Sequence, residues 1–558
     1  MGMITEFTTL IDSILHNQDG NGTSSPLVSL SILVTSFLLF NLVFLITYLT
    51  IIYPYFYSPF RHLPRPKGEI PLLGQSTTPY TKPLGSAYLI WLKSIPNTGL
   101  ITYRSIFNQD RLLLTSPKAI ADVLVHNTYA YTKHPAERSV IGRFLGDGLT
   151  ISEGEVHRFQ RRKSGPVYGA RNVKGFYGVF WGKGVEFVGR IEGHLQRNSN
   201  SNGYAVGWGR KGLWGIEEIG QWATRTTMDI IGLAALEKDF GCLSGDGVNG
   251  DLFKAYQEIF TWAPEKELFM ALNRILPRTV VSWLPWWVNE RIDVTSATLR
   301  SACRALVRER MEDFRRTGGQ GEDLMSIMMR SGGWEAEELV EQLLTIIAAG
   351  HETSASAFTW TCYLLAQHAT AQDRLRAELR TVIPPLLTQT PAPNPETLST
   401  TLESLVYLNA TINETLRLIP PVPLIRRVSK HPTTILNHSI PANTHVLISP
   451  YAINRSPELW GPDAEQFKPE RWIDPETARV NNHGGAVSSY ANLTFSHGQR
   501  SCIGQGFARA ELRALLAVFV NRFRVQLHEP AESVVPVGIV SVRPRGGLRL
   551  RIERVGEK

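Results

Sequence analysis

The chain has 558 residues, of which 43% are hydrophobic, and it carries a formal net charge of +8. This share of apolar residues suits a folded protein with a sizeable core and excludes wholesale disorder. A basic balance fits nucleic acid, an anionic membrane surface or an acidic protein partner. No run of Lys and Arg interleaved with aromatic residues is present, so nucleic acid is not expected as a ligand.

The first predicted element is an uncharged apolar stretch over residues 27–53. It exceeds the roughly 20 residues that cross a bilayer core, which predicts a transmembrane anchor behind a lumenal segment of residues 1–26. A cleaved signal peptide would have a shorter apolar core behind a basic head, whereas this head is acidic. The basic residues follow the stretch, so the large C-terminal part is expected in the cytosol.

Two features flank the predicted anchor. Asn21-Gly22-Thr23 is a glycosylation sequon on the predicted lumenal side. On the other side, residues 54–75 are rich in Pro, which stiffens a chain and blocks helix continuation. They predict a hinge in front of a globular body that comprises residues 76–558.

Within the body, helical periodicity dominates and a few alternating segments predict strands. Strands are expected at residues 100–105, 111–114, 444–449 and 534–542. Helices are expected at residues 117–125, over residues 334–365 as one long element, and at residues 507–522. The fold class is therefore mostly α with a small β portion.

The cysteines are far apart and form no CxxC pair, so neither a disulfide scaffold nor a zinc knuckle is indicated. Cys502 differs from the others because Gly498 and Gly504 flank it and Arg500 precedes it. The predicted helix that follows favours thiolate over thiol through its N-terminal N–H groups. The alternative, an ordinary buried cysteine, is preferred for Cys242, Cys303 and Cys362.

The segment around Cys502 resembles the signature of the haem-thiolate monooxygenases, the cytochromes P450. Their pattern Phe-x-x-Gly-x-Arg-x-Cys-x-Gly is matched by Phe495, Gly498, Arg500, Cys502 and Gly504. The resemblance implies the cytochrome P450 fold behind one transmembrane helix. It also implies haem b between a long central helix and the cysteine loop, with Cys502 as the ligand of the iron.

The sequence Ala349-Gly350-His351-Glu352-Thr353 resembles the oxygen-activation motif of that family. A hydroxyl and a carboxylate at this place are expected to relay protons, which assigns Thr353 and Glu352 to catalysis. Gly350 is expected to give room for oxygen. Members that rearrange peroxides often lack the threonine, so its presence favours a monooxygenase.

A pair at i and i+3, Glu414 and Arg417, precedes Arg471 in the segment 467–472. Such pairs are common on solvated helix faces. By resemblance to the family, however, these three residues are expected to form a buried structural triad.

Further cations are candidate partners of the haem propionates. His157 and Arg161 share a helix face at i and i+4, although the family usually has Trp where His157 stands. Arg427 matches another propionate partner of the family. A basic face for docking an acidic electron donor is expected from Arg158, Arg162, Lys163, Arg509 and Arg513.

The predicted function is insertion of one oxygen atom from O2 into a lipophilic small molecule, such as a terpenoid, polyketide or fatty-acyl compound. The family places its pocket above residues 345–353, with walls from residues 129–148, 422–425 and 537–540. Residues 283–287, rich in Trp, are either a membrane-dipping lip or core packing.

The chain has no G-x-G-x-x-G unit for NADPH or flavin. Electrons are therefore expected from NADPH through a separate reductase, which the resemblance identifies as the NADPH-cytochrome reductase of the endoplasmic reticulum membrane. Two alternatives remain open: a haem-thiolate isomerase or dehydratase that needs no reductase, and a non-enzymatic haem-binding sensor.

Overall fold

The computed structural model describes residues 26–202, 213–245, 250–276, 278–284, 286–538 and 540–556. The predicted lumenal residues 1–25, with the Asn21 sequon, lie outside this part. The chain divides into two compact units. Unit 1 comprises Met1–Leu63, Lys67–Ser76 and Tyr103–Asp110, and unit 2 comprises Pro64–Pro66, Thr77–Thr102 and Arg111–Lys558.

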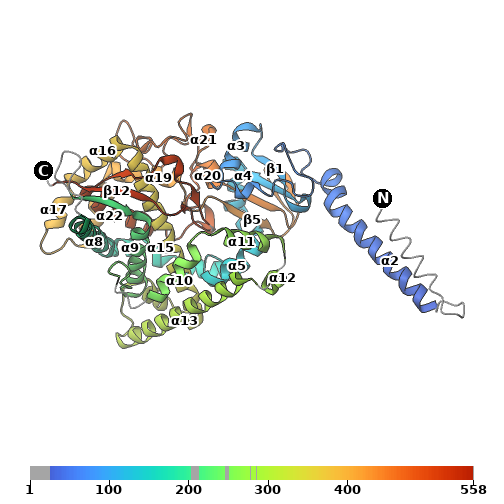
Figure 1. Ribbon diagram of the computed structural model, residues 1–558, viewed down its shortest axis with the longest axis horizontal. Coiled ribbons are helices and arrows are strands. Elements are labelled where there is room, and N and C mark those ends of the chain that lie inside the picture. Colours follow the sequence, from blue (N-terminus) through green and yellow to red (C-terminus); the bar gives the residue numbers. More distant parts are fainter. Residues whose placement is uncertain are drawn as a thin grey trace. The chain divides into compact units, whose positions relative to one another are not determined.

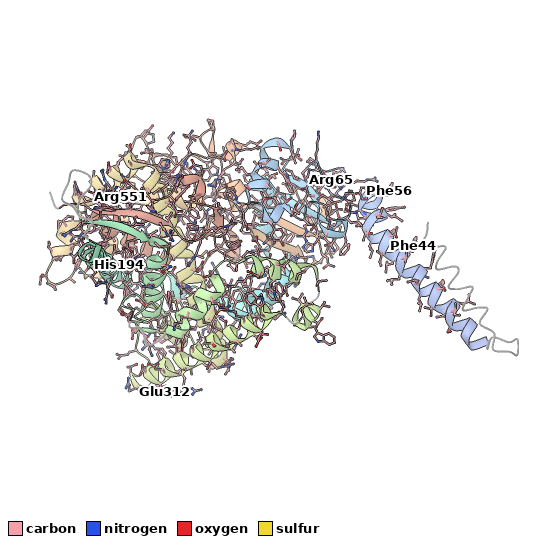
Figure 2. The ribbon with its side chains drawn as sticks, viewed as in Figure 1. Phe44, Phe56, Arg65, His194, Glu312 and Arg551 are labelled. Carbon is pink, nitrogen blue, oxygen red and sulfur yellow. The ribbon has the colours of Figure 1, made fainter. Side chains whose placement is uncertain are left out.

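Unit 1 contains the apolar helix. α2 (Pro26–Thr47) continues directly into the π-helical η1 (Tyr48–Tyr57). The 28 residues Leu30–Tyr57 are long and apolar enough to cross a membrane. Phe44 and Phe56 project from this helix and are more than half exposed (Figure 2). The helix is compatible with a single-pass membrane anchor.

The C-terminal end of this helix is tied to the segment Tyr103–Asp110 of the same unit. Asn108 donates a 2.7 Å hydrogen bond to the carbonyl of Thr50, and Arg104 donates one of 3.0 Å to the carbonyl of Pro54. The Arg104 guanidinium also lies 3.7 Å from the centre of the Tyr55 ring. The helix therefore runs through Pro54 to Tyr57, and the Pro-rich segment begins after it.

The helices of unit 2 carry most of its mass. They are α3 (Ser86–Ser94), α4 (Pro117–Ala121), α5 (Pro135–Leu145), α6 (Gly154–Ser164), α7 (Ala170–Gly175), α8 (Tyr177–Asn202), α9 (Ile219–Leu236), α10 (Gly250–Phe260), α11 (Pro264–Ile275), α12 (Arg278–Trp283), α13 (Trp287–Arg316), α14 (Leu324–Arg330), α15 (Ala336–Gln367), α16 (Ala369–Arg380), α17 (Ile383–Thr388), α18 (Pro395–Ser404), α19 (Val406–Leu418), α20 (Pro450–Ile453), α21 (Pro457–Trp460) and α22 (Gln505–Arg522).

The strands are short and form small sheets. They are β1 (Leu100–Arg104), β2 (Asp110–Leu114), β3 (Tyr131–Thr132), β4 (Trp214–Glu218), β5 (Ile425–Ser429), β6 (Thr433–Ile435), β7 (His438–Ile440), β8 (His445–Ile448), β9 (Phe523–Leu527), β10 (Pro536–Val537), β11 (Arg543–Pro544) and β12 (Arg549–Arg554).

Pairing within unit 2 brings distant segments together. In one sheet β8 runs parallel to β2 and antiparallel to β5, with Leu447 opposite Leu113 on one side and Arg426 on the other. In a second sheet β12 lies between β4 and β9, antiparallel to both. The chain's C-terminal strand is thus held by two strands from elsewhere in the sequence.

The long helix α15 runs through the helical part of unit 2, where it packs against α9, α13, α19 and α22 (Figure 1). A capping box starts it: the Glu335 side chain accepts from the third helical residue, and Glu338 accepts from the Glu335 backbone. Residues on all sides of the helix are buried, which is typical of a central core helix.

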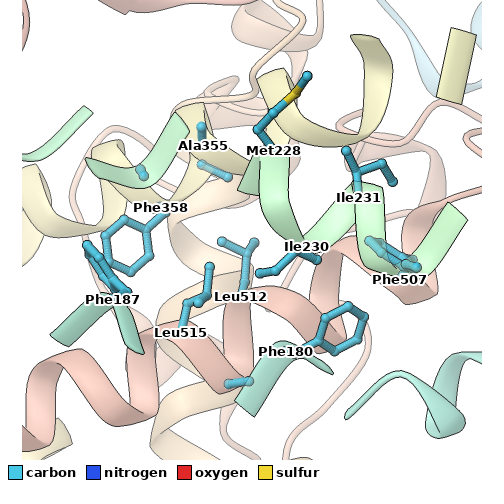
Figure 3. Packing of buried hydrophobic residues seen from close by; sticks show 14 of the residues in the cluster. Phe180, Phe187, Met228, Ile230, Ile231, Ala355, Phe358, Phe507, Leu512 and Leu515 are labelled. Atoms are coloured by element: carbon cyan, nitrogen blue, oxygen red, sulfur yellow. The ribbon is translucent and has the colours of Figure 1, made fainter. Parts of the chain in front are cut away.

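Apolar residues of α22 and α15 interlock in the core with α8 and α9. Leu512, Leu515 and Phe507 of α22 lie in one cluster with Phe358 of α15, and all four are buried (Figure 3). This packing fixes the helix that follows Cys502 against the helix that carries the oxygen-activation motif.

Most predicted elements are confirmed. The strands expected at residues 100–105, 111–114 and 444–449, the long helix and the helix after Cys502 are all present. The helix expected at residues 117–125 is α4 followed by the π-helical η4 (Asp122–His126). The strand expected over residues 534–542 is wrong in extent, because among the described residues of this range only β10 forms a strand, which pairs with β11.

Candidate functional site

Cys502 lies in a tight turn at the start of α22. The 3₁₀ turn η9 (Gly498–Arg500) precedes Cys502. The backbone N–H of Cys502 donates a 2.8 Å hydrogen bond to the carbonyl of Phe495. Gly498 has φ +72°, and a Cβ there would lie 2.1 Å from the carbonyl oxygen of Leu124. Only glycine fits this position. A Cβ at Gly504, in contrast, would meet nothing within 4 Å.

Cys502 is the exposed cysteine, while Cys242, Cys303 and Cys362 are buried. Burial of the surrounding turn raises the pKa of the Cys502 thiol, and the Gly504 N–H and the Arg161 cation oppose this. The expected thiolate-stabilising groups are therefore present but are outweighed in the free chain. A coordinated metal ion removes the proton of a thiol outright, so the turn suits a sulfur ligand.

A cluster of cations lies beside this turn. Arg500 forms an ion pair with Glu153, and it is almost fully buried. Lys133 donates a 2.9 Å hydrogen bond to the carbonyl of Ser152 and lies 3.8 Å from the Glu153 carboxylate. Arg427 is also buried, 9% exposed. Lys133 and Arg500 thus share the Glu153 carboxylate, and Arg427 lies within electrostatic reach of Glu153 and Glu137.

Burial, together with neighbouring cations, lowers the pKa of Lys133, Arg427 and His157. Burial, opposed by Glu153 and reinforced by Arg500 and Arg427, lowers the pKa of Lys133 to about 7. Burial and then Arg500 lower the pKa of Arg427 to about 10. Burial and the neighbouring cations lower the pKa of His157 to about 3. An anion bound here would reverse these shifts.

The two predicted propionate partners on α6, His157 and Arg161, contact different residues. Arg161 donates a 2.6 Å hydrogen bond to the carbonyl of Ser501, next to Cys502. The Nδ1 atom of His157 lies 3.1 Å from the hydroxyl of Tyr129. The structure thus brings both to the cysteine side of the cluster.

The residues fit haem, which carries two carboxylates. In the described part of the chain, the Nε and Nη1 atoms of Arg500 are buried without a hydrogen-bond partner. Buried N–H groups of a guanidinium are costly to leave unpaired. Propionates would satisfy them, and they would supply the negative charge that Glu153 alone does not. Sequence reasoning missed Lys133, Glu153 and Tyr129, which no motif marks.

The oxygen-activation motif lies on α15 as predicted, but its side chains face different ways. Thr353 donates a 2.8 Å hydrogen bond to the carbonyl of Ala349. The buried Glu352 carboxylate accepts hydrogen bonds from Ser541 and Arg543. Consecutive residues of a helix point about 100° apart, so the hydroxyl and the carboxylate are neighbours in sequence without sharing a face.

The partners of Glu352 were not predicted. Arg543 also donates a 3.0 Å hydrogen bond to the Thr224 hydroxyl of α9. The carboxylate is therefore ion-paired, which removes the cost of burying it alone. A Cβ at Gly350 would lie 2.7 Å from Cδ1 of Ile231, so this glycine allows the close approach of α9, and its room for oxygen stays a prediction.

The predicted triad is formed. Arg417 makes two 2.8 Å hydrogen bonds to the Glu414 carboxylate, and Arg471 makes one of 2.9 Å. The Trp472 indole N–H adds another at 2.9 Å, and the backbone N–H of Lys468 one at 3.0 Å. Glu414 and Arg417 are fully buried. Every oxygen of the carboxylate is thus used within the protein.

The expected docking face is partly wrong. Arg509 donates to the Asn413 side chain, and Arg513 makes a 2.6 Å hydrogen bond to Asn409, both on α19. Burial lowers the pKa of Arg509 to about 10. These two side chains are occupied inside the fold. Of the remaining set, Arg158 and Arg162 are exposed, and Lys163 is partly buried.

An apolar pocket lies between α5, α10, α11 and α13. It is lined by Val140, Phe144, Ile259, Phe260, Phe269, Met270, Val288, Ile292 and Val540, with Glu258, Lys266 and Arg291 among the remaining residues. A second cavity shares Met270 and Val540 and includes the polar residues Tyr80, Glu267 and Arg426. The predicted walls contribute, whereas residues 345–353 line neither cavity.

The Trp-rich segment after α12 is largely exposed. Trp283 is 91% exposed and Trp287 48%. Trp286 packs against the Phe269 ring, with ring centres 5.9 Å apart. Core packing therefore explains Trp286 and does not explain Trp283.

Comparisons with known proteins agree with the geometry. The family description "Cytochrome P450" matches residues 98–547. The chain is 37% identical to cytochrome P450 monooxygenase sphH of Aspergillus fumigatus, over 90% of this chain and 89% of that protein. It is 36% identical to cytochrome P450 monooxygenase ptmK of Penicillium ochrochloron, over 90% of this chain and 96% of the relative. With cytochrome P450 monooxygenase FUM15 of Gibberella moniliformis the identity is 33%, over 90% of each chain.

Proposed function

The chain belongs to the cytochrome P450 family, and we propose that it inserts one oxygen atom from O2 into a lipophilic small molecule. It is a monooxygenase, an oxidoreductase that binds haem b and takes its electrons from a redox partner. The observation that carries the proposal is the exposed Cys502 turn beside a cluster of buried cations in which two nitrogens of Arg500 have no hydrogen-bond partner in the described part of the chain.

We assign the iron ligand to Cys502 and the propionate contacts to Arg500, Arg427, Arg161, His157 and Lys133. When bound, haem supplies the iron at which O2 is reduced, with electron density from the sulfur. The Gly498 turn, closed by the hydrogen bond from Cys502 to the Phe495 carbonyl, holds the sulfur in place.

The proton-handling roles fall to Thr353 and Glu352. The Thr353 hydroxyl donates its one proton to the Ala349 carbonyl and keeps its lone pairs, so it can accept a hydrogen bond in this position, and it passes its own proton on after it rotates away from Ala349. Glu352 is held by Arg543 and Ser541. It can exchange protons only when one of those bonds opens, so Thr353 is assigned the direct role and Glu352 the resupply.

Glu414, Arg417 and Arg471 are assigned to structure. Their contacts are saturated within the protein, and Arg417 also donates 2.6 Å hydrogen bonds to the carbonyls of Asn454 and Ala464. They fasten α19 to the segment that leads to the cysteine turn.

The cavity supports a substrate with an apolar body, because hydrophobic side chains form most of its lining. The second cavity shares Met270 and Val540, and its charged residues Arg426 and Glu267 are paired with Glu137 and Lys82. Such an apolar molecule is typical of fungal specialised metabolism. The relatives sphH and FUM15 are fungal cytochrome P450 monooxygenases, and their names specify no substrate. The exposed Trp283 and Trp287 would dip into the membrane and guide lipophilic substrates inward.

We further infer that the electron donor is an NADPH-cytochrome reductase in the endoplasmic reticulum membrane, with unit 2 on the cytosolic side. The apolar helix Leu30–Tyr57 and the basic residues that follow it support this placement.

The deciding experiment is product profiling by mass spectrometry in a host that expresses this chain with and without a reductase. A monooxygenase yields a product 16 mass units above its substrate, and only with reductase and NADPH. A product without reductase would instead identify an isomerase or dehydratase. Haem binding without any product across fractionated lipophilic extracts would favour the sensor.

A further inference from the structure

Unit 1 exposes large apolar side chains outside its long helix. They lie in two short segments, residues 70–73 and residues 105–109, neither of which contains a charged residue. The exposed side chains are those of Ile70, Leu72, Leu73 and Phe107, each 45–53% exposed. Large apolar side chains that gather on one surface mark a site of interaction with another molecule or with a membrane.

Hydrogen bonds join the two segments. The backbone N–H of Phe107 donates a 2.6 Å hydrogen bond to the carbonyl of Leu72, and that of Gln75 donates one of 2.7 Å to the carbonyl of Arg104. Phe107 and Leu72 both have positive φ, +57° and +60°. This conformation is rare for bulky residues and persists only where the surrounding structure holds it. The four exposed side chains therefore form one patch, which we call the apolar tip.

The apolar tip is tied to the helix of unit 1 at a defined depth. The side chain of Asn108, next to Phe107, donates a 2.7 Å hydrogen bond to the carbonyl of Thr50. Thr50 lies seven residues before Tyr57, where the apolar span ends. At no more than about 1.5 Å per helical residue, the tip reaches up to roughly 10 Å along the helix from that end.

In a bilayer this depth corresponds to the boundary between headgroups and hydrocarbon. The span has 28 residues, which at about 1.5 Å each match the roughly 40–45 Å of a bilayer with its headgroup regions. With Tyr57 at the outer edge, Thr50 lies near the inner limit of the headgroups. Amphipathic elements that lie on a membrane bury their apolar side chains by about 5–10 Å at this boundary.

The charged residues beside the tip lie nearer to the end of the helix. The Arg104 guanidinium lies 3.4 Å from the Glu69 carboxylate and 3.9 Å from that of Asp110. It also donates a hydrogen bond to the carbonyl of Pro54, which is four residues closer to Tyr57 than Thr50 is. These charges thus stay at the level of the headgroups, where charged groups are tolerated, while the uncharged tip extends past them.

We propose that the apolar tip is a second membrane contact of this chain, in which Phe107 and Leu72 insert into the interfacial region of the bilayer beside the apolar helix. The proposal rests on the membrane placement of Leu30–Tyr57 proposed above. The tip continues the apolar surface of that helix, so lipid is its partner. A second contact fixes the tilt of unit 1 on the membrane, which one helix alone leaves free.

The test attaches the environment-sensitive fluorophore NBD to an introduced cysteine of the full-length, haem-loaded chain. Cys242, Cys303 and Cys362 are buried and Cys502 is the proposed iron ligand, so the native chain should take up no label. Each variant is placed, one chain per nanodisc, in phosphatidylcholine of which a part carries a nitroxide high on the acyl chain. The label in Phe107→Cys should emit at shorter wavelength than in water and should be quenched by the nitroxide.

Two further variants calibrate the measurement. Phe56→Cys replaces an exposed residue of the helix (Figure 2) and should be quenched as well. Val487→Cys replaces a residue of unit 2 that is 71% exposed and lies outside the tip, and its label should not be quenched. All three variants should keep the red-shifted carbon-monoxide band, which shows that they fold and bind haem.

The proposal would be overturned if the label in Phe107→Cys behaved like that in Val487→Cys while that in Phe56→Cys was quenched. Because each nanodisc holds one chain, this result would leave the tip to a protein partner. Equal quenching at all three positions would also overturn it, since the contact would be unspecific. Absent quenching in Phe56→Cys would refute the membrane placement and the tip with it. Failure of the proposed function is seen separately, as loss of the carbon-monoxide band in the native chain.

Discussion

Glu414 and Glu153 are both carboxylates set among cations, and they differ in how completely the surrounding N–H groups are used. Around Glu414, two arginines, an indole N–H and a backbone N–H all end on the carboxylate. Around Glu153, Arg500 retains two buried nitrogens without a partner in the described part of the chain.

The difference separates a structural lock from a binding site. A saturated cluster has nothing left to offer a ligand, whereas a surplus of buried cations is stable only when anions are added. The haem b that the cytochrome P450 family binds carries two propionates, which are anions of this kind. The comparison therefore supports the proposal that the Glu414 cluster stabilises the fold and that the Glu153 cluster binds the haem propionates.

The largest expected effect is at the cysteine turn beside the cation surplus. Cys502→Ser should abolish the red-shifted carbon-monoxide band of the ferrous protein, because that band reports thiolate ligation. Ser at Cys242, Cys303 or Cys362 should leave the band in place, since these thiols are buried away from the cluster. If Cys502→Ser retained the band, Cys502 would not be the iron ligand and the haem site would lie elsewhere.

The second-largest effect is expected in the Glu414 cluster, where every hydrogen-bonding group of the carboxylate is used. Glu414→Gln leaves Arg417 and Arg471 buried with a neutral partner, which should cost about 3–5 kcal/mol of unfolding free energy. Urea unfolding, or the yield of folded haem protein where the variant is too unstable, measures it.

The matched control in the haem-side cluster is Glu153→Gln. In this variant the cations around residue 153 can bond the propionates instead. It should cost well under half of the Glu414→Gln effect in the haem-loaded protein. Equal costs would erase the distinction between the two clusters.

The sequence predicted the saturated side better than the binding side. Glu414, Arg417 and Arg471 stand in recognisable short segments, and the structure joins them. Glu153 and Arg500 are 347 positions apart and meet only through the fold. Lys133 and Tyr129 carry no motif, so a sequence pattern had no means of marking them.

The same limit applies on α15. The motif located Glu352 and Thr353, but not Arg543 or Ser541, which reach Glu352 from a turn near the C-terminus. The close approach of Ile231 of α9 to Gly350 was not predicted either, because this contact is tertiary and leaves no trace in the local pattern.

Thr353→Ala tests whether Glu352 can deliver protons without the Thr353 hydroxyl. Like Glu414, Glu352 is held by an arginine, so we expect that it cannot. With the hydroxyl gone, the carboxylate remains held by Arg543, so protons should arrive too slowly. Product per NADPH should fall by about 10-fold, with more hydrogen peroxide released, while NADPH use continues. Thr353→Ser keeps a hydroxyl and should restore most of the product. A parallel loss of NADPH use and product would indicate that Thr353 only packs.

The smallest effect concerns Lys133, one cation among several around Glu153. Burial and the adjacent arginines lower the pKa of Lys133 to about 7, so much of it is neutral in the haem-free chain at pH 7 and above. An arriving propionate favours the charged form and raises that pKa, so haem binding takes up a proton and weakens as pH rises from 7 to 9. Lys133→Met should speed haem transfer to apomyoglobin by roughly threefold at pH 7, and the pH dependence should flatten. Lys163→Met is the control, because Lys163 instead bonds the carbonyl of Ser331. If the variant kept the steep pH dependence, Lys133 would not belong to the set of cations that the haem completes.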